Sequence, residues 1–156
     1  MLSLDWMEAR RLSQWVLLHY KLPSKPSASR VYIWRKLKRL GAILLHSAVW
    51  VLPATAYTLE QFQWLAVEIG EMAGEATVWE AQLALAGREE ALVERFTQQV
   101  DTAYGGILAR LEKARPDLAA LSREYQQAQA RDYFGSELGR RVRAALVTPA
   151  AKGGPP

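Results

Sequence analysis

The feature that most constrains the fold of this chain is a stretch from Leu40 to Leu59 in which no side chain carries a charge. About 20 apolar residues are enough to cross a bilayer as a helix. Here Gly41, His46 and Pro53 interrupt the stretch, and its segments AILLH and VWVLP have the length and composition of strands. The stretch therefore predicts a buried β-hairpin and no membrane segment, with a transmembrane helix as the alternative.

A strand and a helix are predicted before this hairpin. The apolar run Trp15–Tyr20 is typical of a central strand. After a proline-rich turn, Ser27 or Ser29 can cap a helix that continues to Leu40, where Gly41 ends it.

A second helix and a last strand are predicted after the hairpin. Thr58–Gln61 matches a capping box, and the helix that it opens would end at Gly74. Ala76–Leu85 then predicts a strand. The order β-α-β-β-α-β predicts an α+β fold of the ferredoxin-like kind, a four-stranded antiparallel sheet with two helices on one face.

The remainder of the chain predicts a helical extension of about three helices. Apolar residues recur there at helical spacing, with a kink expected at Gly105-Gly106 and a break at Gly135-Ser136. The predicted organisation is an N-terminal extension over 1–14, the ferredoxin-like domain over 15–86, the helical extension over 87–147 and a disordered tail over 148–156.

Charge is distributed unevenly along the chain. Residues 9–59 hold nine Lys and Arg and no acid, whereas residues 60–156 hold fourteen acids and eleven bases. The basic N-terminal part beside a mildly acidic remainder indicates that an anionic partner binds on one side of the protein. The alternative is that the basic side chains only face solvent and bind no partner.

The first predicted helix is amphipathic, and its polar face is basic. Ile33, Leu37 and Leu40 fall on one side, with Trp34 on its flank. No acid within this helix neutralises the opposite side, so we expect DNA, another polyanion or a regulatory partner to bind there. The predicted nucleic-acid-binding residues are Tyr32, Arg35, Lys36, Lys38 and Arg39.

Arg30 stands apart from this face. It lies in the first turn of the helix, close to Lys21 and Lys25 of the preceding loop. A guanidinium beside the free N–H groups of a helix N-terminus can hold a tetrahedral oxyanion. The three residues form a predicted anion site, and an arginine that only braces the proline loop is the alternative.

Tryptophan is frequent, with six residues. Five of them fall in predicted strands or helices, which favours core packing over base stacking; these are Trp15, Trp34, Trp50, Trp64 and Trp79. Because the tryptophans of the strands bring large apolar groups to a sheet with one uncovered face, a homodimer is expected, and coverage of that face by the C-terminal helices of the same chain is the alternative.

Several classes of protein are excluded. Cysteine is absent and only His19 and His46 could supply imidazole, so disulfides, thiol catalysis and cysteine-based metal sites are excluded and a histidine-rich metal site is not expected. No nucleophile motif or paired carboxylates accompany the basic N-terminal part. We expect no enzymatic activity and no cofactor. The first residues lack the apolar region of a signal peptide, which predicts a cytoplasmic protein.

The segments KLPSKPSASRVYIWRKLKRLGA, VWVLP, QFQWLA and VWEAQL together carry a resemblance to a known family. They resemble the N-terminal domain of the chromate resistance protein ChrB, over roughly residues 15–147. More distantly, the fold and basic helix are similar to the PaaX repressors and to small CRISPR-associated nucleases.

The resemblance implies a chromate-responsive regulator of a chromate efflux operon. The residues that it carries over are Lys21, Lys25, Arg30, Arg35, Lys36, Lys38 and Arg39. Full-length members carry a second, C-terminal domain that this sequence does not show. The nucleases use an acid at the end of the first strand, where this chain has His19-Tyr20-Lys21, so nuclease activity is the weakest alternative. A chromate- or sulfate-binding sensor is the stronger alternative.

Overall fold

The structure is a computed structural model that describes residues 14–46, 49–85 and 87–147. The predicted disordered tail and all but Gln14 of the predicted N-terminal extension lie outside the described residues, as do Trp6, Arg10 and Arg11. The chain divides into two compact units after Arg88, and each is described by itself.

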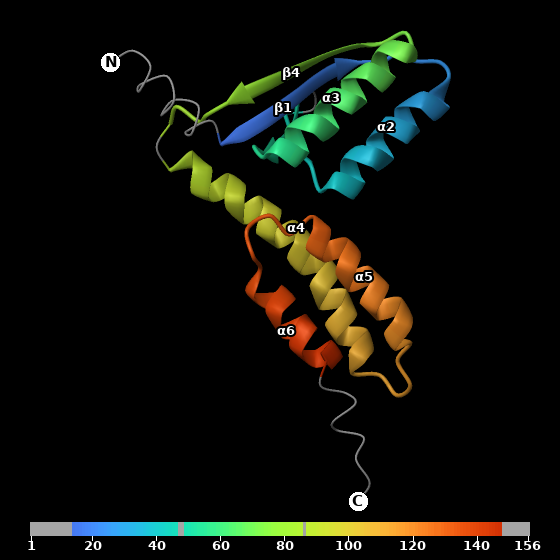
Figure 1. Ribbon diagram of the computed structural model, residues 1–156, viewed down its shortest axis with the longest axis vertical. Helices are drawn as coiled ribbons and strands as arrows, with labels where there is room; N and C mark the ends of the chain where they lie inside the picture. The colour runs from blue at the N-terminus through green and yellow to red at the C-terminus, as the bar shows by residue number, and fades with distance from the viewer. Residues whose placement is uncertain (1–13, 47–48, 86, 148–156) are drawn as a thin grey trace, which may run out of the picture. The chain divides into compact units, whose positions relative to one another are not determined.

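The first unit is a four-stranded antiparallel sheet with two helices (Figure 1). Its strand order is β2-β3-β1-β4, which confirms the predicted α+β fold. The elements are β1 (Trp15–Lys21), α2 (Ser27–Leu40), β2 (Ile43–Leu45), β3 (Val49–Pro53), α3 (Ala56–Glu71) and β4 (Glu75–Ala81).

The uncharged stretch forms the β2–β3 hairpin, as predicted, with Ile43 paired to Val51 and Leu45 to Val49. Hydrogen bonding within a sheet satisfies the backbone of this stretch without a membrane-spanning helix. In the parts of the chain that the structure describes, no helix is long and apolar enough to span a membrane.

The core of this unit lies between the sheet and the two helices. Val16 and Leu18 of β1 pair with Leu52 and Trp50 of β3, so these four side chains share one face. All four are buried. Helices α2 and α3 lie on one side of the sheet (Figure 1) and bury five apolar residues of their own, Ile33, Leu37, Phe62, Leu65 and Ile69.

Helix α2 begins without the predicted serine cap. Its N-cap is Pro26, no side chain caps it, and Ser27 is its first helical residue. The preceding proline thus sets the start of the helix, because its extended backbone already places Ser27 in the first turn. Gly41 ends the helix as predicted, with a left-handed φ of 79° that glycine adopts without strain.

The capping box of α3 lies one turn earlier than predicted. The Thr55 hydroxyl accepts a hydrogen bond from the Thr58 amide at 3.0 Å, and the Thr58 hydroxyl accepts one from the Thr55 amide at 2.9 Å. The Thr58 hydroxyl also donates to the Pro53 carbonyl at the end of β3. Thr55 is therefore the N-cap and Thr58 the third residue of the helix, so the prediction of a capping box over Thr58–Gln61 is wrong.

Strand β4 is shorter than the predicted Ala76–Leu85. Its last residue, Ala81, pairs with Trp15, which is the first residue of β1. The strand ends where its partner does. The preceding helix also ends before Gly74, with Glu71 as its last residue and Met72 as its C-cap.

Three tryptophans are exposed where core packing is predicted. Trp15 and Trp50 are buried, but Trp34, Trp64 and Trp79 are 51%, 60% and 56% exposed. Trp34 and Trp64 are exposed because each helix buries only a narrow row of side chains, and neither tryptophan belongs to that row. Trp79 alternates with Val78 on an edge strand, so it lies on the face opposite the helices.

The second unit contains the three predicted helices, α4 (Arg88–Leu111), α5 (Leu118–Ala130) and α6 (Glu137–Val147). α4 continues without interruption through Gly105 and Gly106. Six buried residues, contributed by all three helices, form one cluster: Val100, Tyr104, Ile107, Leu121, Ala128 and Val142.

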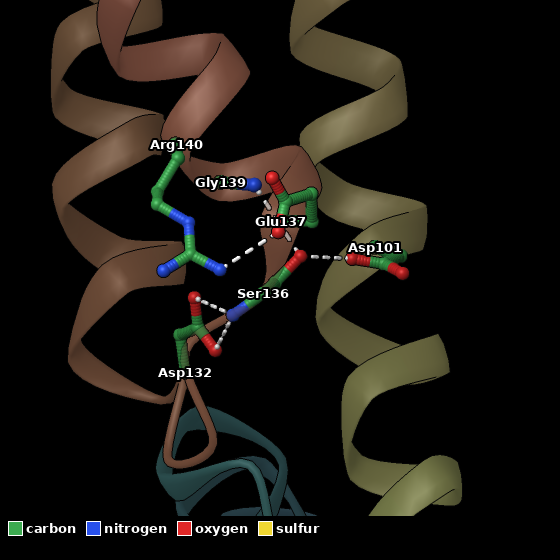
Figure 2. Close-up of polar contacts among 6 residues, drawn as sticks. All are labelled: Asp101, Asp132, Ser136, Glu137, Gly139 and Arg140. Atoms are coloured by element: carbon green, nitrogen blue, oxygen red, sulfur yellow. Dashed lines mark hydrogen bonds and ion pairs between the residues drawn. The ribbon is translucent and has the colours of Figure 1, made fainter.

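A polar cluster holds the start of α6 against α4 (Figure 2). The Ser136 hydroxyl accepts from the Gly139 amide at 3.3 Å and donates to the Asp101 carboxylate. The Asp132 carboxylate accepts from the Ser136 amide at 3.0 Å and from the Tyr104 hydroxyl at 2.9 Å. Burial, together with the bond to Asp132, raises the pKa of Tyr104 well above its usual value. These contacts provide hydrogen-bond partners from within the protein for amide groups at the start of α6.

Gly74→Ala is expected to destabilise the first unit. A Cβ at this position would lie 2.6 Å from the Lys21 carbonyl oxygen and 2.8 Å from side-chain atoms of Ile69 and Leu22. The expected loss in the free energy of unfolding is about 2 kcal/mol, measured by denaturant unfolding. Gly70→Ala is the control, since nothing lies within 4 Å of its Cβ, and it should be neutral or stabilising. Equal effects would contradict the close approach at Gly74.

Candidate functional site

Helix α2 divides its residues between core and solvent as its periodicity predicts. Ile33 and Leu37 are completely buried, whereas Arg35, Lys38 and Arg39 are exposed. Lys38 and Arg39 lie in the last turn, where positive charge also interacts favourably with the helix dipole. The packing of the apolar stripe therefore presents three cations to solvent.

Lys36 differs from these cations because an acid from another helix engages it. Its Nζ donates to Glu68 Oε1 of α3 at 2.7 Å, and the Tyr32 hydroxyl donates to the same oxygen at 3.3 Å. The Lys36 Nζ also lies 4.8 Å from the centroid of the Tyr32 ring. The bond to Glu68 raises the pKa of Lys36.

This contact corrects the expectation of a basic face without a neutralising acid. Glu68 is 32 residues from Lys36 in the sequence, so a comparison within α2 alone could not find it. Lys36 and Tyr32 serve in the joint between α2 and α3, and they are less available to a partner than Arg35 and Arg39. Among the described residues, neither Arg35 nor Arg39 forms an ion pair.

A pocket of about 690 Å³ opens beside the start of α2. Three aromatic side chains from three elements line it, Tyr20 of β1, Trp34 of α2 and Trp50 of β3. Arg30 lines the same pocket, and the remaining lining residues are Leu22, Ser24, Ser27, Val31 and Leu44.

The pocket gathers only part of the predicted anion site. Arg30 contributes to it, and the lining residues Ser24 and Ser27 come from the loop and the first turn of α2. Lys21 and Lys25 are exposed and do not line it. Burial raises the pKa of the Tyr20 hydroxyl, while a hydrogen bond with Trp50 and the charge of Arg30 act in the opposite direction.

Sequence reasoning missed the aromatic character of this pocket. The position of Trp34 on the flank of the apolar side of its helix is the one sequence signal that this side chain borders both the core and solvent. Within the described ranges, no group of three His, Asp or Glu side chains is arranged to hold a metal ion.

Comparison with known proteins gives two matches. The model of the family described as Protein ChrB, N-terminal, matches residues 30–109, which include α2 from Arg30 onward. A relative named Protein ChrB, from Cupriavidus metallidurans, is 29% identical over 105 residues. That alignment covers 67% of this chain and 32% of the relative, so the chain spans about a third of the relative's length. No solved structure matches the chain.

Lys36→Ala is expected to lower stability more than Arg35→Ala or Arg39→Ala. Removing the ammonium leaves the partly buried Glu68 carboxylate without its counter-ion, with only the Tyr32 hydroxyl still donating to that oxygen. Because the pair is partly exposed, the expected loss in the free energy of unfolding is about 1 kcal/mol. The two arginine variants remove the same charge from exposed positions and should melt like the unmodified protein. Equal melting temperatures for all three variants would show that the Lys36–Glu68 pair does not join the helices.

Proposed function

The chain belongs to the family of ChrB N-terminal domains, and on that premise we propose that it is a regulator of chromate resistance that binds DNA or a similar polyanion through α2. The proposal is of a non-enzymatic protein that acts in the cytoplasm. Its link to chromate comes from the family resemblance, and its mode of binding from the surface of α2.

The observation that supports polyanion binding is the exposure of Arg35, Lys38 and Arg39 on one helix. Cations at this spacing can each neutralise a phosphate and release the counterions that it had bound. Lys36 contributes less, because its charge is compensated by Glu68. The proposed contact surface is therefore narrower than the predicted basic face.

A chromate or sulfate sensor is the second candidate, and Arg30 favours it. The guanidinium borders a pocket together with Ser24 and Ser27, close to the first turn of α2, where backbone N–H groups lack intrahelical partners. An oxyanion bound there would gain charge-assisted hydrogen bonds from the planar guanidinium.

We also propose a homodimer that uses the β4 side of the sheet face opposite α2 and α3, since Ile43 and Val51 on the same face are already buried. Trp79, at 56% exposure, supports it by placing a large apolar side chain on that face. A strict monomer in sedimentation at high protein concentration would exclude the dimer.

Arg35→Ala and Arg39→Ala are each expected to weaken binding to duplex DNA. Each variant should also reduce the slope of log affinity against log salt by about one unit, because one phosphate contact is lost. Fluorescence anisotropy at several salt concentrations measures both effects. Arg123→Ala, an exposed arginine of α5 without an ion pair among the described residues, is the matched control and should change neither quantity. Absence of binding to any duplex at low salt would refute the proposal.

The sensor candidate predicts a different response at Arg30. Calorimetric titration with chromate or sulfate should give heat, and Arg30→Lys should reduce the anion affinity, since lysine keeps the charge but not the bidentate geometry. An Arg30 that only braces the loop would instead lower the melting temperature on substitution. No heat from either anion with the unmodified protein would exclude the sensor.

A further inference from the structure

The pocket beside α2 combines features that neither candidate function uses in full. Tyr20, Trp34 and Trp50 give it an aromatic lining, and Arg30 gives it a positive charge. Its volume of about 690 Å³ lies within the range of small-molecule sites. A ligand that satisfies this lining needs both a planar face and an anionic group.

A tetrahedral oxyanion meets only half of this requirement. It would fill a small part of the pocket, engage Arg30 and leave the aromatic lining without a partner. An uncharged aromatic ligand would leave Arg30, Ser24 and Ser27 without one. A nucleotide has a π face for the aromatic side chains and a phosphate for the guanidinium.

We propose that this pocket receives one unpaired base of a single nucleic-acid strand, whose phosphate Arg30 binds. The inference rests on the proposed polyanion binding by α2 and adds an unpaired strand to the duplex as a second form of nucleic acid that the chain binds. Trp34 is the stacking residue, because it is 51% exposed and lines the pocket. Bases inside a duplex are already stacked on both faces, so only an unpaired base can use this ring.

The placement of cations along α2 favours a nucleic-acid strand over a free mononucleotide as the ligand of the pocket. Arg30, Trp34 and Lys38 are spaced four residues apart and therefore form one row along the helix. The Lys38 Nζ lies 6.0 Å from the centroid of the Trp34 ring. A base stacked on Trp34 would thus have a cation on each side along the row, one for its own phosphate and one for a neighbouring phosphate.

The test compares single-stranded and duplex DNA of one sequence. Fluorescence anisotropy with an oligothymidine and with its duplex measures both affinities at one salt concentration. Trp34→Ala should weaken single-strand binding about 5- to 150-fold, the range for loss of one stacked base, and change duplex binding little. Trp34→Phe keeps an aromatic face and should retain most of the affinity. Trp64→Ala removes a comparably exposed tryptophan from α3, outside the pocket, and should affect neither ligand.

Two further ligands define the outcome. A strand of abasic nucleotides should bind the unmodified protein as weakly as oligothymidine binds the Trp34→Ala variant, and thymidine monophosphate should bind more weakly than the oligomer. Equal losses for strand and duplex, or no loss with Trp34→Ala, would overturn the pocket inference. Duplex binding that remains sensitive to Arg35→Ala would then leave the proposed function standing, whereas no binding of either form would overturn both.

Discussion

The burial of Ile33 and Leu37 against the sheet is the interaction on which the rest of the first unit depends. With both side chains fully buried, α2 has only one rotation about its axis. That rotation directs Arg35 and Arg39 to solvent, turns Lys36 toward Glu68 of α3 and leaves Arg30 at the rim of the pocket. The chemistry of the surface is therefore a consequence of how the core packs.

The sequence predicts the architecture well because the fold follows from local periodicity. Each strand and helix of the first unit has its own pattern, and the order of these patterns leaves few topologies. Some of the errors lie where distant parts of the chain decide the outcome. The exposure of Trp79 depends on β4 being an edge strand, and the position of β4 in the sheet cannot be read from the residues beside Trp79. The error in the capping box is different, because Pro53, Thr55 and Thr58 are close neighbours in the sequence.

The candidate site shows the same limit. The solvent side of α2 was predictable from the spacing within one helix, and Arg30 was recognisable as different from the other cations. Its aromatic surroundings were not, because Tyr20, Trp34 and Trp50 come from three elements that meet only in the folded sheet. Glu68 was missed for the same reason, since it reaches Lys36 across two helices. The charge of a side chain is known from the sequence, but the oppositely charged residue that pairs with it is known only from the fold.

The close packing at Gly74 has a consequence for chain length. The turn that joins α3 to β4 lies against the Lys21 carbonyl and the Leu22 side chain, and Leu22 is itself part of the pocket wall. An added residue in that turn would press on the segment that leads from β1 into α2. An insertion in this turn is therefore expected to displace Leu22 and, with it, one wall of the neighbouring pocket.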